Sequence, residues 1–514
     1  MHRLEITFLV IILAVTSLRG QDSLRPAVTD SLALRKTDSL YPTPIDSLRL
    51  PLSDSLRPLM TDSLYLEMPD SLTGVLIDSL SGVRVDSLPH VQVGNPRMAQ
   101  TDSLTYRQYL DGDYRSLIET SRKARQEGIS FYYLNYRTAI AYYALKNYAK
   151  AATFYKETLA ETPDDPTLKE SLYYAYLLSG QKENAAILAR TMAPHTQAIV
   201  GYTPSAMDQL SLSGGYMTNN NKPDIRPSAG FDSLNQYQDM IFSALGIGFN
   251  LSERAKLKLG YQLYNTRFER SAGTALLKED NLSQHQLVAA LEFFTPGNIT
   301  WGFSGGYYNI EKADNTLITT IGSYGPGAGG RGYGQPFYYT TSTGKRSSAL
   351  SLLAFFNKRF TYTVPEIAVA YANFGGLHQY QAKGSLTYYP LGNLHIYGIS
   401  SAAVIYNPDG WPTTEQYILS QQFGVKLFGP LWLDANASYG NHLNYITERS
   451  FLVYDTYDPV KVLAGLSLSW YLKRMTVSSG YQWQQKEGYA YSSTDYTTYK
   501  YNNHLVNIAL SWNF

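Results

Sequence analysis

The sequence ends in HLVNIALSWNF, residues 504–514, and this stretch decides the fold. Successive side chains of a strand point to opposite faces. One face is apolar and ends in two aromatic residues; its members are Val506, Ile508, Leu510, Trp512 and Phe514. The other face is mostly small or polar; its members are Leu505, Asn507, Ala509, Ser511 and Asn513. Because one face suits lipid and the other suits a polar lumen, the pattern predicts a strand in the wall of a membrane barrel.

A terminal aromatic residue that closes such an alternation resembles the C-terminal strand by which outer-membrane β-barrels are recognised for assembly. The resemblance assigns Leu510, Trp512 and Phe514 to the assembly strand. It also implies two partners, the lipids of the outer membrane and the barrel-assembly machinery.

The start of the chain predicts an exported protein. His2 and Arg3 form a short basic segment, and residues 6–15 form an apolar run too short for a helix that spans a bilayer. We expect residues 1–20 to be a signal peptide. The two ends together predict a protein of the Gram-negative outer membrane whose N-terminal part lies in the periplasm.

The composition excludes several classes of protein. The chain has no cysteine, which excludes disulfides, thiol nucleophiles and cysteine-bound metals. A net charge of +1 gives no electrostatic argument for nucleic acid as a partner. No segment after the signal peptide holds about eighteen apolar residues in a row, so membrane-spanning helices are not expected. A membrane protein without such helices must be a closed barrel.

Residues 21–102 form a low-complexity repeat. Asp-Ser-Leu recurs every eight residues from Asp22 to Asp86 and again at Asp102. Prolines between the copies oppose both a helix and a paired central strand. One leucine per octad builds little core, so we expect an extended, disordered stalk.

The fixed tripeptide between variable spacers resembles the Asp-(Ser/Thr)-aliphatic sequon of periplasmic O-glycosylation in one lineage of Gram-negative bacteria. The resemblance makes ten serines glycan acceptors: Ser23, Ser31, Ser39, Ser47, Ser55, Ser63, Ser71, Ser79, Ser87 and Ser103. Two other interpretations stay open, an inert linker left by replication slippage and a short β-solenoid.

We predict that several of these serines carry glycan. Sugars on every eighth residue of an extended chain would lie about 26 Å apart at roughly 3.3 Å per residue, which avoids crowding. Intact-mass spectrometry of protein from its native host measures the modification. Stalk peptides that all have their unmodified mass would contradict glycosylation and leave a plain spacer.

From residue 103 to 196 the apolar spacing becomes helical and resembles tetratricopeptide (TPR) repeats. The fullest copy of the signature consists of Ala139, Tyr142, Ala151, Tyr155 and Pro163. A partial copy follows at the repeat length of about 34 residues: Leu172, Tyr176, Gly180 and Ala185. A degenerate copy precedes it: Gly112, Tyr114 and Ala124. Thr138 and Lys146 depart from the family, which usually has an apolar residue and Gly there. The resemblance implies a concave surface for a periplasmic protein or peptide; the alternative is a spacer.

Residues 202–514 are predicted to form an antiparallel transmembrane barrel of fourteen strands, which makes the chain a multidomain protein. The strands are expected at 206–217, 240–250, 254–268, 282–294, 299–311, 347–357, 361–374, 378–389, 393–406, 416–428, 431–446, 460–472, 475–488 and 503–514. Short and long connections alternate, as short periplasmic turns and long outer loops do in outer-membrane barrels. Whether the longest loop, 312–346, folds into the pore or faces outward stays open.

The alternation also predicts which side chains enter the lumen. The charged members are Lys256, Lys258, Glu292, Lys383, Lys426, Asp434 and Lys486. Their signs are mixed, so no ion selectivity is evident. Tyr307, Tyr388 and Tyr439 lie near strand ends and suit interfacial girdles.

No catalytic site is evident in the barrel sequence. Its histidines lie on different expected strands and show no repeating partner pattern; they are His285, His378, His395, His442 and His504. We therefore expect no enzyme, no cofactor and no metal site.

The plan of a periplasmic TPR module ahead of a barrel resembles the outer-membrane exporters of cellulose and poly-N-acetylglucosamine. The resemblance implies a barrel whose module recruits a partner for transport, export or envelope assembly, with a polysaccharide as one cargo. The chain departs from these exporters in its few repeats, its fewer strands and its added stalk. The alternatives are a glycosylated structural anchor with a closed barrel and, more distantly, a barrel enzyme.

Overall fold

The computed structural model describes residues 96–219, 234–272, 275–321, 336–374, 376–409, 414–450, 452–453, 458–491 and 496–514. The expected signal peptide, the stalk up to residue 95 and its serines from Ser23 to Ser87 lie outside these residues. So does the middle of the longest loop, residues 322–335.

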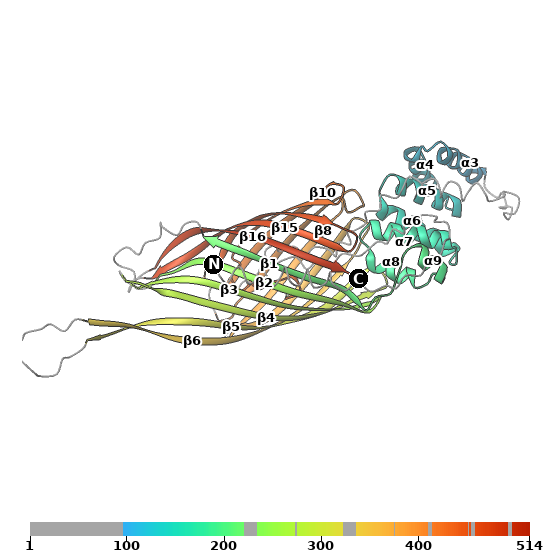
Figure 1. Ribbon diagram of the computed structural model, residues 1–514. Helices are drawn as coiled ribbons and strands as arrows, with labels where there is room; N and C mark the ends of the chain where they lie inside the picture. The colour runs from blue at the N-terminus through green and yellow to red at the C-terminus, as the bar shows by residue number, and fades with distance from the viewer. Residues whose placement is uncertain are drawn as a thin grey trace, which may run out of the picture. The chain divides into compact units, whose positions relative to one another are not determined.

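Seven helices precede the barrel in the described part of the chain (Figure 1). They are α3 (Pro96–Leu110), α4 (Tyr114–Gln126), α5 (Tyr132–Ala144), α6 (Tyr148–Glu161), α7 (Pro166–Leu178), α8 (Lys182–Ala189) and α9 (Pro194–Ile199). Helix α3 begins ahead of the expected module and includes Asp102 and Ser103, with Ser103 exposed. None of the described helices is long and apolar enough to cross a membrane.

Local signals in the sequence explain where the helices begin and end. The side chains of Asp113, Asn147 and Asp165 accept hydrogen bonds from the first-turn amides of α4, α6 and α7. The turn after α5 holds Lys146 in the left-handed region at φ 59°. This is the position where the repeat family usually has Gly, which tolerates that conformation best.

The helices pack as the spacing of small and aromatic residues predicts. Ala139 and Ala151 are fully buried between α5 and α6, where they let the helices approach around Tyr155. Leu172 of α7 joins this core, and Ala185 belongs to the next one. Packed helical hairpins are therefore present, while their assignment to the TPR class stays a prediction.

The other signature residues lie at helix edges and turns. Tyr142 and Tyr176 are partly buried against the core of α5–α7, and Ala124 is buried in α4. Gly112 and Gly180 occupy turns at positive φ, Tyr114 begins α4, and Pro163 is exposed between α6 and α7.

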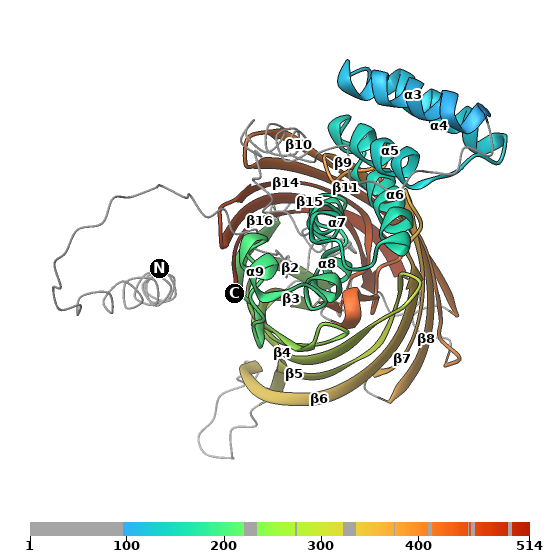
Figure 2. The ribbon, with the colours of Figure 1, turned by 90° about the vertical axis from the view of Figure 1, so that its right-hand side faces the viewer.

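Fourteen antiparallel strands close into a barrel, with β1 paired to β16 (Figures 1 and 2). The strands are β1 (Met207–Asn219), β2 (Leu234–Ser252), β3 (Ala255–Ala272), β4 (Ala275–Thr295), β5 (Ile299–Ile321), β6 (Pro336–Lys358), β7 (Thr363–Phe374), β8 (Leu377–Tyr388), β9 (Ile396–Tyr406), β10 (Glu415–Phe428), β11 (Leu431–Gly440), β14 (Val460–Tyr471), β15 (Met475–Tyr491) and β16 (Tyr496–Asn513). The predicted helical module followed by a fourteen-stranded antiparallel barrel is confirmed, and each predicted strand overlaps one of these.

Two predictions about connections needed correction or completion. The strand expected at 431–446 ends at Gly440, after which the chain leaves the wall. In the longest connection, residues 312–321 pair with 336–345, so β5 and β6 continue the wall beyond the other strands (Figure 1). The described part of that connection therefore does not fold into the lumen.

The outer face of the barrel is apolar, as the C-terminal strand predicted. Ile508 and Trp512 are 53% and 47% exposed, whereas Leu505 and Asn513 are fully buried. Large apolar side chains are exposed in the same way on the other strands, among them Leu259, Leu287, Phe303, Val369 and Leu466. A closed strand ladder with this outer surface is a membrane-spanning barrel.

A lysine at position 508 should impair assembly, because Ile508 lies within the apolar band. A cation near the bilayer midplane costs about 2–4 kcal/mol on the lipid face. The adjacent lumenal residue provides the control, and Asn507→Lys should cost clearly less. Heat-modifiable migration on gels and urea unfolding in vesicles measure both variants. Equal effects of the two lysines would contradict the assignment of the faces.

Candidate functional site

The lumen is lined by polar and charged side chains of both signs. Five of the seven charged residues predicted to face inward are buried there: Lys256, Glu292, Lys383, Asp434 and Lys486. Lys258 and Lys426 are partly buried. Glutamines on neighbouring strands add amide groups, and both side-chain polar atoms of Gln286 are buried without a protein partner among the described residues. Such a wall suits water or a polar solute better than lipid.

A loop, residues 441–450, crosses this lumen, and we call it the crossing loop. It begins after Gly440, whose φ of 141° favours glycine and turns the chain inward. His442 fixes its root: Nδ1 donates to the Val460 carbonyl at 2.8 Å, and Nε2 accepts from the Ser438 hydroxyl at 2.6 Å. His442 is fully buried but lies in this loop, not in a strand as predicted.

The middle of the crossing loop bonds to β8. Gln379 Nε2 donates to the Asn444 carbonyl at 2.9 Å, and Gln381 Nε2 donates to the Ile446 carbonyl at 2.6 Å. Gln381 Oε1 accepts from the Ile446 amide at 3.0 Å. The loop also holds β12 (Ile446–Thr447), which pairs with β13 (Leu452–Val453), and the turn η2 (Glu448–Ser450).

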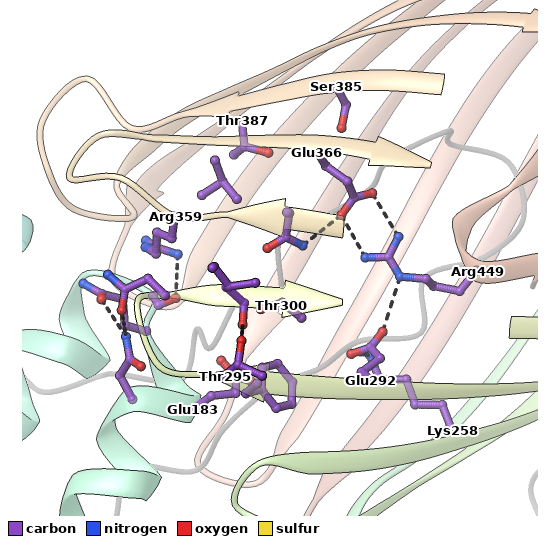
Figure 3. Close-up of a pocket in the computed structure, with 18 residues that line it drawn as sticks. Glu183, Lys258, Glu292, Thr295, Thr300, Arg359, Glu366, Ser385, Thr387 and Arg449 are labelled. Atoms are coloured by element: carbon purple, nitrogen blue, oxygen red, sulfur yellow. Dashed lines mark hydrogen bonds and ion pairs between the residues drawn. The ribbon is translucent and has the colours of Figure 1, made fainter. Parts of the chain in front are cut away.

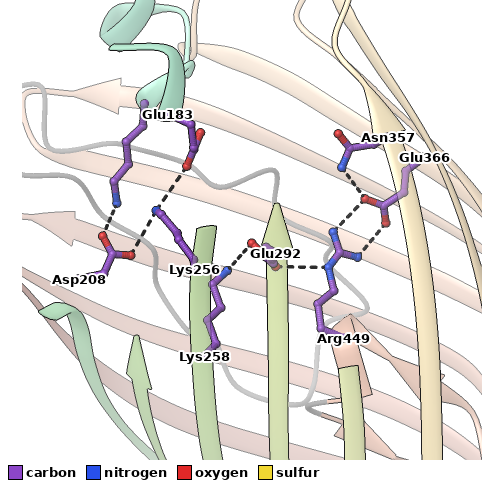
Figure 4. Close-up of polar contacts among 9 residues, drawn as sticks. Glu183, Asp208, Lys256, Lys258, Glu292, Asn357, Glu366 and Arg449 are labelled. Carbon is purple, nitrogen blue, oxygen red and sulfur yellow. Dashed lines mark hydrogen bonds and ion pairs between the residues drawn. The ribbon is translucent and has the colours of Figure 1, made fainter. Parts of the chain in front are cut away.

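The tip of the crossing loop binds the far wall. Both terminal nitrogens of Arg449 donate to Glu366 at 2.9 Å, and its Nε donates to Glu292 at 3.4 Å (Figure 4). The guanidinium lies 3.3 Å from the ring centroid of Phe355. In the strand order, β4–β7 lie opposite β11 and β14, from which the loop springs. The loop therefore spans the full width of the barrel.

Helix α8 reaches the same network from the side of the short turns (Figure 4). Lys182 donates to Asp208 of β1 at 2.9 Å, and both groups are buried. Lys256 lies 3.3 Å from Asp208 and 3.4 Å from Glu183. Lys258 lies two residues after Lys256 on the same face of β3, and its Nζ is 3.3 Å from a carboxylate oxygen of Glu292. Charged groups thus extend from α8 along the lumen wall to the crossing loop.

A cavity of about 160 Å³ lies between α8, the wall and the crossing loop. Figure 3 shows Glu183, Glu292, Glu366 and Arg449 around it, together with hydroxyl groups of the wall. The hydroxyl groups belong to Thr295, Thr300, Ser385 and Thr387. Because its charges balance and its other donors are hydroxyls and amides, the cavity suits an uncharged polar group.

The turns of the barrel hold the helices through further contacts. Arg359 donates to the carbonyls of Ser179 and Gly180, and Asn393 Nδ2 donates to the Lys146 carbonyl at 2.8 Å. Burial, then the cations of Lys426 and Lys146, lowers the pKa of His395 to about 4, so this histidine is neutral near pH 7. Arg190 pairs with Glu253 in the β2–β3 turn.

The prediction that the histidines share no partner pattern was wrong. His285, His378 and His504 each bond through Nδ1 to a tyrosine hydroxyl on the neighbouring strand. The pairing needs the strand register, which the spacing in the sequence does not give. Among the described residues, no group of three or more histidine, aspartate or glutamate side chains could hold a metal ion.

The charged contacts of the site were only partly predicted. Lys256, Lys258 and Glu292 were placed in the lumen by strand alternation. Arg449, Glu366 and Asp208 were missed, and so were Lys182 and Glu183 of α8. A charged residue inside an apolar strand was an available signal for Glu366.

No family model matches this sequence, and no curated protein matches it. Among solved structures, the chain is similar to a FadL homologue of Pseudomonas aeruginosa, with 9% identity over 64% of this chain and 94% of that one, and a TM-score of 0.40. The chain is also similar to the P. putida toluene transporter TodX, with 10% identity over 62% of this chain and 92% of that one, and a TM-score of 0.39. A third similar structure is a bacterial polysaccharide outer membrane secretin, with 8% identity over 61% of this chain and 100% of that one, and a TM-score of 0.31. Identities this low say nothing about cargo; the chain's own strand order and apolar outer face define it as a membrane-spanning barrel.

Proposed function

We propose that this chain is a gated transport barrel of the outer membrane, closed at rest by the crossing loop. The observation that carries the proposal is the way residues 441–450 span the lumen. They add no strand to the fourteen-stranded ladder. Their polar ties to the far wall are hydrogen bonds and the ion pairs of Arg449, which can exchange for water or cargo without unpairing the wall. Ile446 also packs among apolar side chains of β5–β7, and opening would have to release this contact as well.

The helical module is the proposed receiver of a periplasmic partner. Its packed hairpins support a peptide- or protein-binding surface. Through Lys182 and Glu183, a movement of α8 would reach Asp208 and Lys256 inside the lumen. A partner that shifts α8 would thereby change the lumenal network.

The cargo that best fits the described lumen is a polar, uncharged chain rich in hydroxyls, such as a polysaccharide. Amide and hydroxyl groups are the commonest polar groups of the wall, where they lie beside apolar and aromatic clusters, and the charges of the cavity balance. The closed barrel and its apolar outer face support an outer-membrane location, and we propose that the helices and short turns lie on the periplasmic side.

A closed structural anchor is the second candidate, and the complete span of the crossing loop favours it. Conductance in planar bilayers separates the two. Under the transport proposal, the wild-type barrel opens rarely. A variant with residues 442–457 replaced by a short Gly-Ser linker conducts steadily and is blocked by a soluble neutral polysaccharide. A folded loop-deletion barrel that never conducts would leave only the anchor.

A further inference from the structure

Among the described residues, three tyrosine–histidine pairs lie on the outer, lipid-facing surface of the barrel. The hydroxyl of Tyr261 lies 2.8 Å from Nδ1 of His285. The corresponding distances are 2.8 Å for Tyr371 and His378 and 2.7 Å for Tyr481 and His504. The pairs join β3 to β4, β7 to β8 and β15 to β16, at three separate places around the barrel.

The height of each pair along the barrel axis depends on the strand tilt as well as on the pairing of the strands. A line of directly paired residues across neighbouring strands, here a register line, is inclined because the strands tilt. From Met217 the line through β2–β5 reaches Lys345 in the outer half of β6. In the other direction it reaches Val364, at the short-turn end of β7. Register lines therefore climb toward the long connections in the first direction and descend in the second.

His504 and His285 lie at the same height. The register line from His504 climbs over four strands to Asn281 of β4, and His285 lies four residues beyond Asn281 toward the short turns. With a tilt of about 35–45°, a step of about 4.8 Å between strands changes the height about as much as one residue of roughly 3.3 Å along a strand. The rise over four strand-to-strand steps and the fall over four residues along β4 therefore cancel, and the two histidines lie at the same height.

His378 belongs to the same ring. In the descending direction the register line from His504 crosses six strands to Leu386 of β8, and His378 lies eight residues nearer the long connections. His378 is therefore within about two residues of the height of the other two, which is roughly 5 Å.

The ring marks the outer edge of the apolar band. Below His285, the next outward residue of β4 is Leu287, which is 55% exposed. Above His504, its register line runs through the ion pair of Asp239 and Arg267, whose Nε–Oδ1 distance is 2.6 Å. The outer surface thus changes from apolar to charged at the level of the histidines. In a membrane this level meets the lipid headgroups.

In each pair the imidazole Nε2 lies on the far side of the ring from the tyrosine. In His504 this Nε2 is buried without a hydrogen-bond partner among the described residues, which leaves His285 and His378 as the histidines that can bind a ligand outside the barrel. When the phenol donates to Nδ1, the proton of the neutral ring resides on Nε2, and this N–H is a donor. Tyrosine alone would serve as an ordinary interfacial aromatic residue. The added histidine supplies an N–H donor. The strongest acceptors at the headgroup level are phosphate oxygens.

We propose that His285 and His378 form two binding sites for the phosphate groups of lipids in the outer leaflet, each site oriented by its tyrosine. The inference needs only the membrane position of the barrel and not an open pore. Phosphate binding therefore stands or fails separately from transport.

The test uses the full chain purified in detergent with phosphatidic acid, whose phosphate is a monoester, and counts retained lipids by native mass spectrometry. Diacylglycerol with the same acyl chains is the control lipid. Wild type should retain up to two phosphatidic acid molecules. The variant His285→Phe/His378→Phe should bind them about tenfold more weakly per site, the usual loss for a hydrogen bond to a charged group.

Two further variants separate the oriented sites from a general aromatic girdle. Tyr261→Phe/Tyr371→Phe keeps the two histidines and removes their partners, so binding should weaken. Tyr307→Phe/Tyr406→Phe/Tyr439→Phe changes three other exposed tyrosines and should bind as wild type does. A folded histidine variant that retains phosphatidic acid like wild type, or equal retention of diacylglycerol, would overturn the proposal.

Discussion

Replacing Arg449 with alanine is expected to lower the free energy of unfolding by about 3–5 kcal/mol, the usual result of removing one partner of a buried ion pair. The guanidinium is the shared partner of Glu292 and Glu366, both of which are buried. Without it, Glu366 loses two hydrogen bonds and the crossing loop loses its tie to the far wall. Urea unfolding in vesicles measures the loss, and bilayer recordings should show more frequent opening.

Two variants control for trivial causes of this loss. Arg346→Ala breaks the pair with Glu311, in which Arg346 is 77% exposed, and should cost no more than about 1 kcal/mol. Adding Glu366→Gln to Arg449→Ala should recover part of the stability, because it removes the charge left without its partner. An Arg449→Ala barrel as stable as wild type would show that the crossing loop is not held by this contact.

Replacing Asp208 with alanine is expected to uncouple the helices from the lumen, again at a cost of about 3–5 kcal/mol. Asp208 is 3% exposed and accepts from Lys182 of α8 and Lys256 of β3. Its removal leaves two buried cations facing each other. Limited proteolysis should then cut the segment between α9 and β1 faster, while the barrel stays heat-modifiable.

The matched control for Asp208 is Asp164→Ala. Asp164 also pairs with a lysine, Lys169, but it is fully exposed. Solvent screens this pair, so the expected cost is at most about 1 kcal/mol and proteolysis should be unchanged. If the two alanine variants were cut equally fast, α8 would not be fastened to the wall through Asp208.

The wall of the barrel could be predicted from the sequence because its signal is local. A strand exposes alternate residues to lipid, so the positions of Ile508 and Leu505 follow from a period of two residues. The signals for helix starts are also local, because each capping side chain bonds to amides of its own first turn. These caps are Asp113, Asn147 and Asp165.

The crossing loop could not be predicted, because its partners are distant in the chain. The polar and apolar residues of 441–446 alternate as they would in a strand, so the sequence predicted that β11 continues to residue 446. Gly440 is the one local sign that the strand ends there. Arg449 meets Glu366 and Glu292, which precede it by 83 and 157 residues. Those meetings depend on how the closed barrel brings strands face to face. The tyrosine–histidine pairs depend in the same way on register.

The central claim is that the crossing loop is a movable closure, and a disulfide lock tests it most directly. The chain has no cysteine, so Ser304→Cys/Ser450→Cys introduces a unique pair. The two hydroxyl oxygens lie 3.1 Å apart and join the loop to β5. Conductance of the double variant is recorded in planar bilayers before and after a reductant, with Ser304→Cys alone as the control. The account predicts no openings while the disulfide is intact and wild-type openings after reduction; openings of the same size and frequency in both states would contradict it.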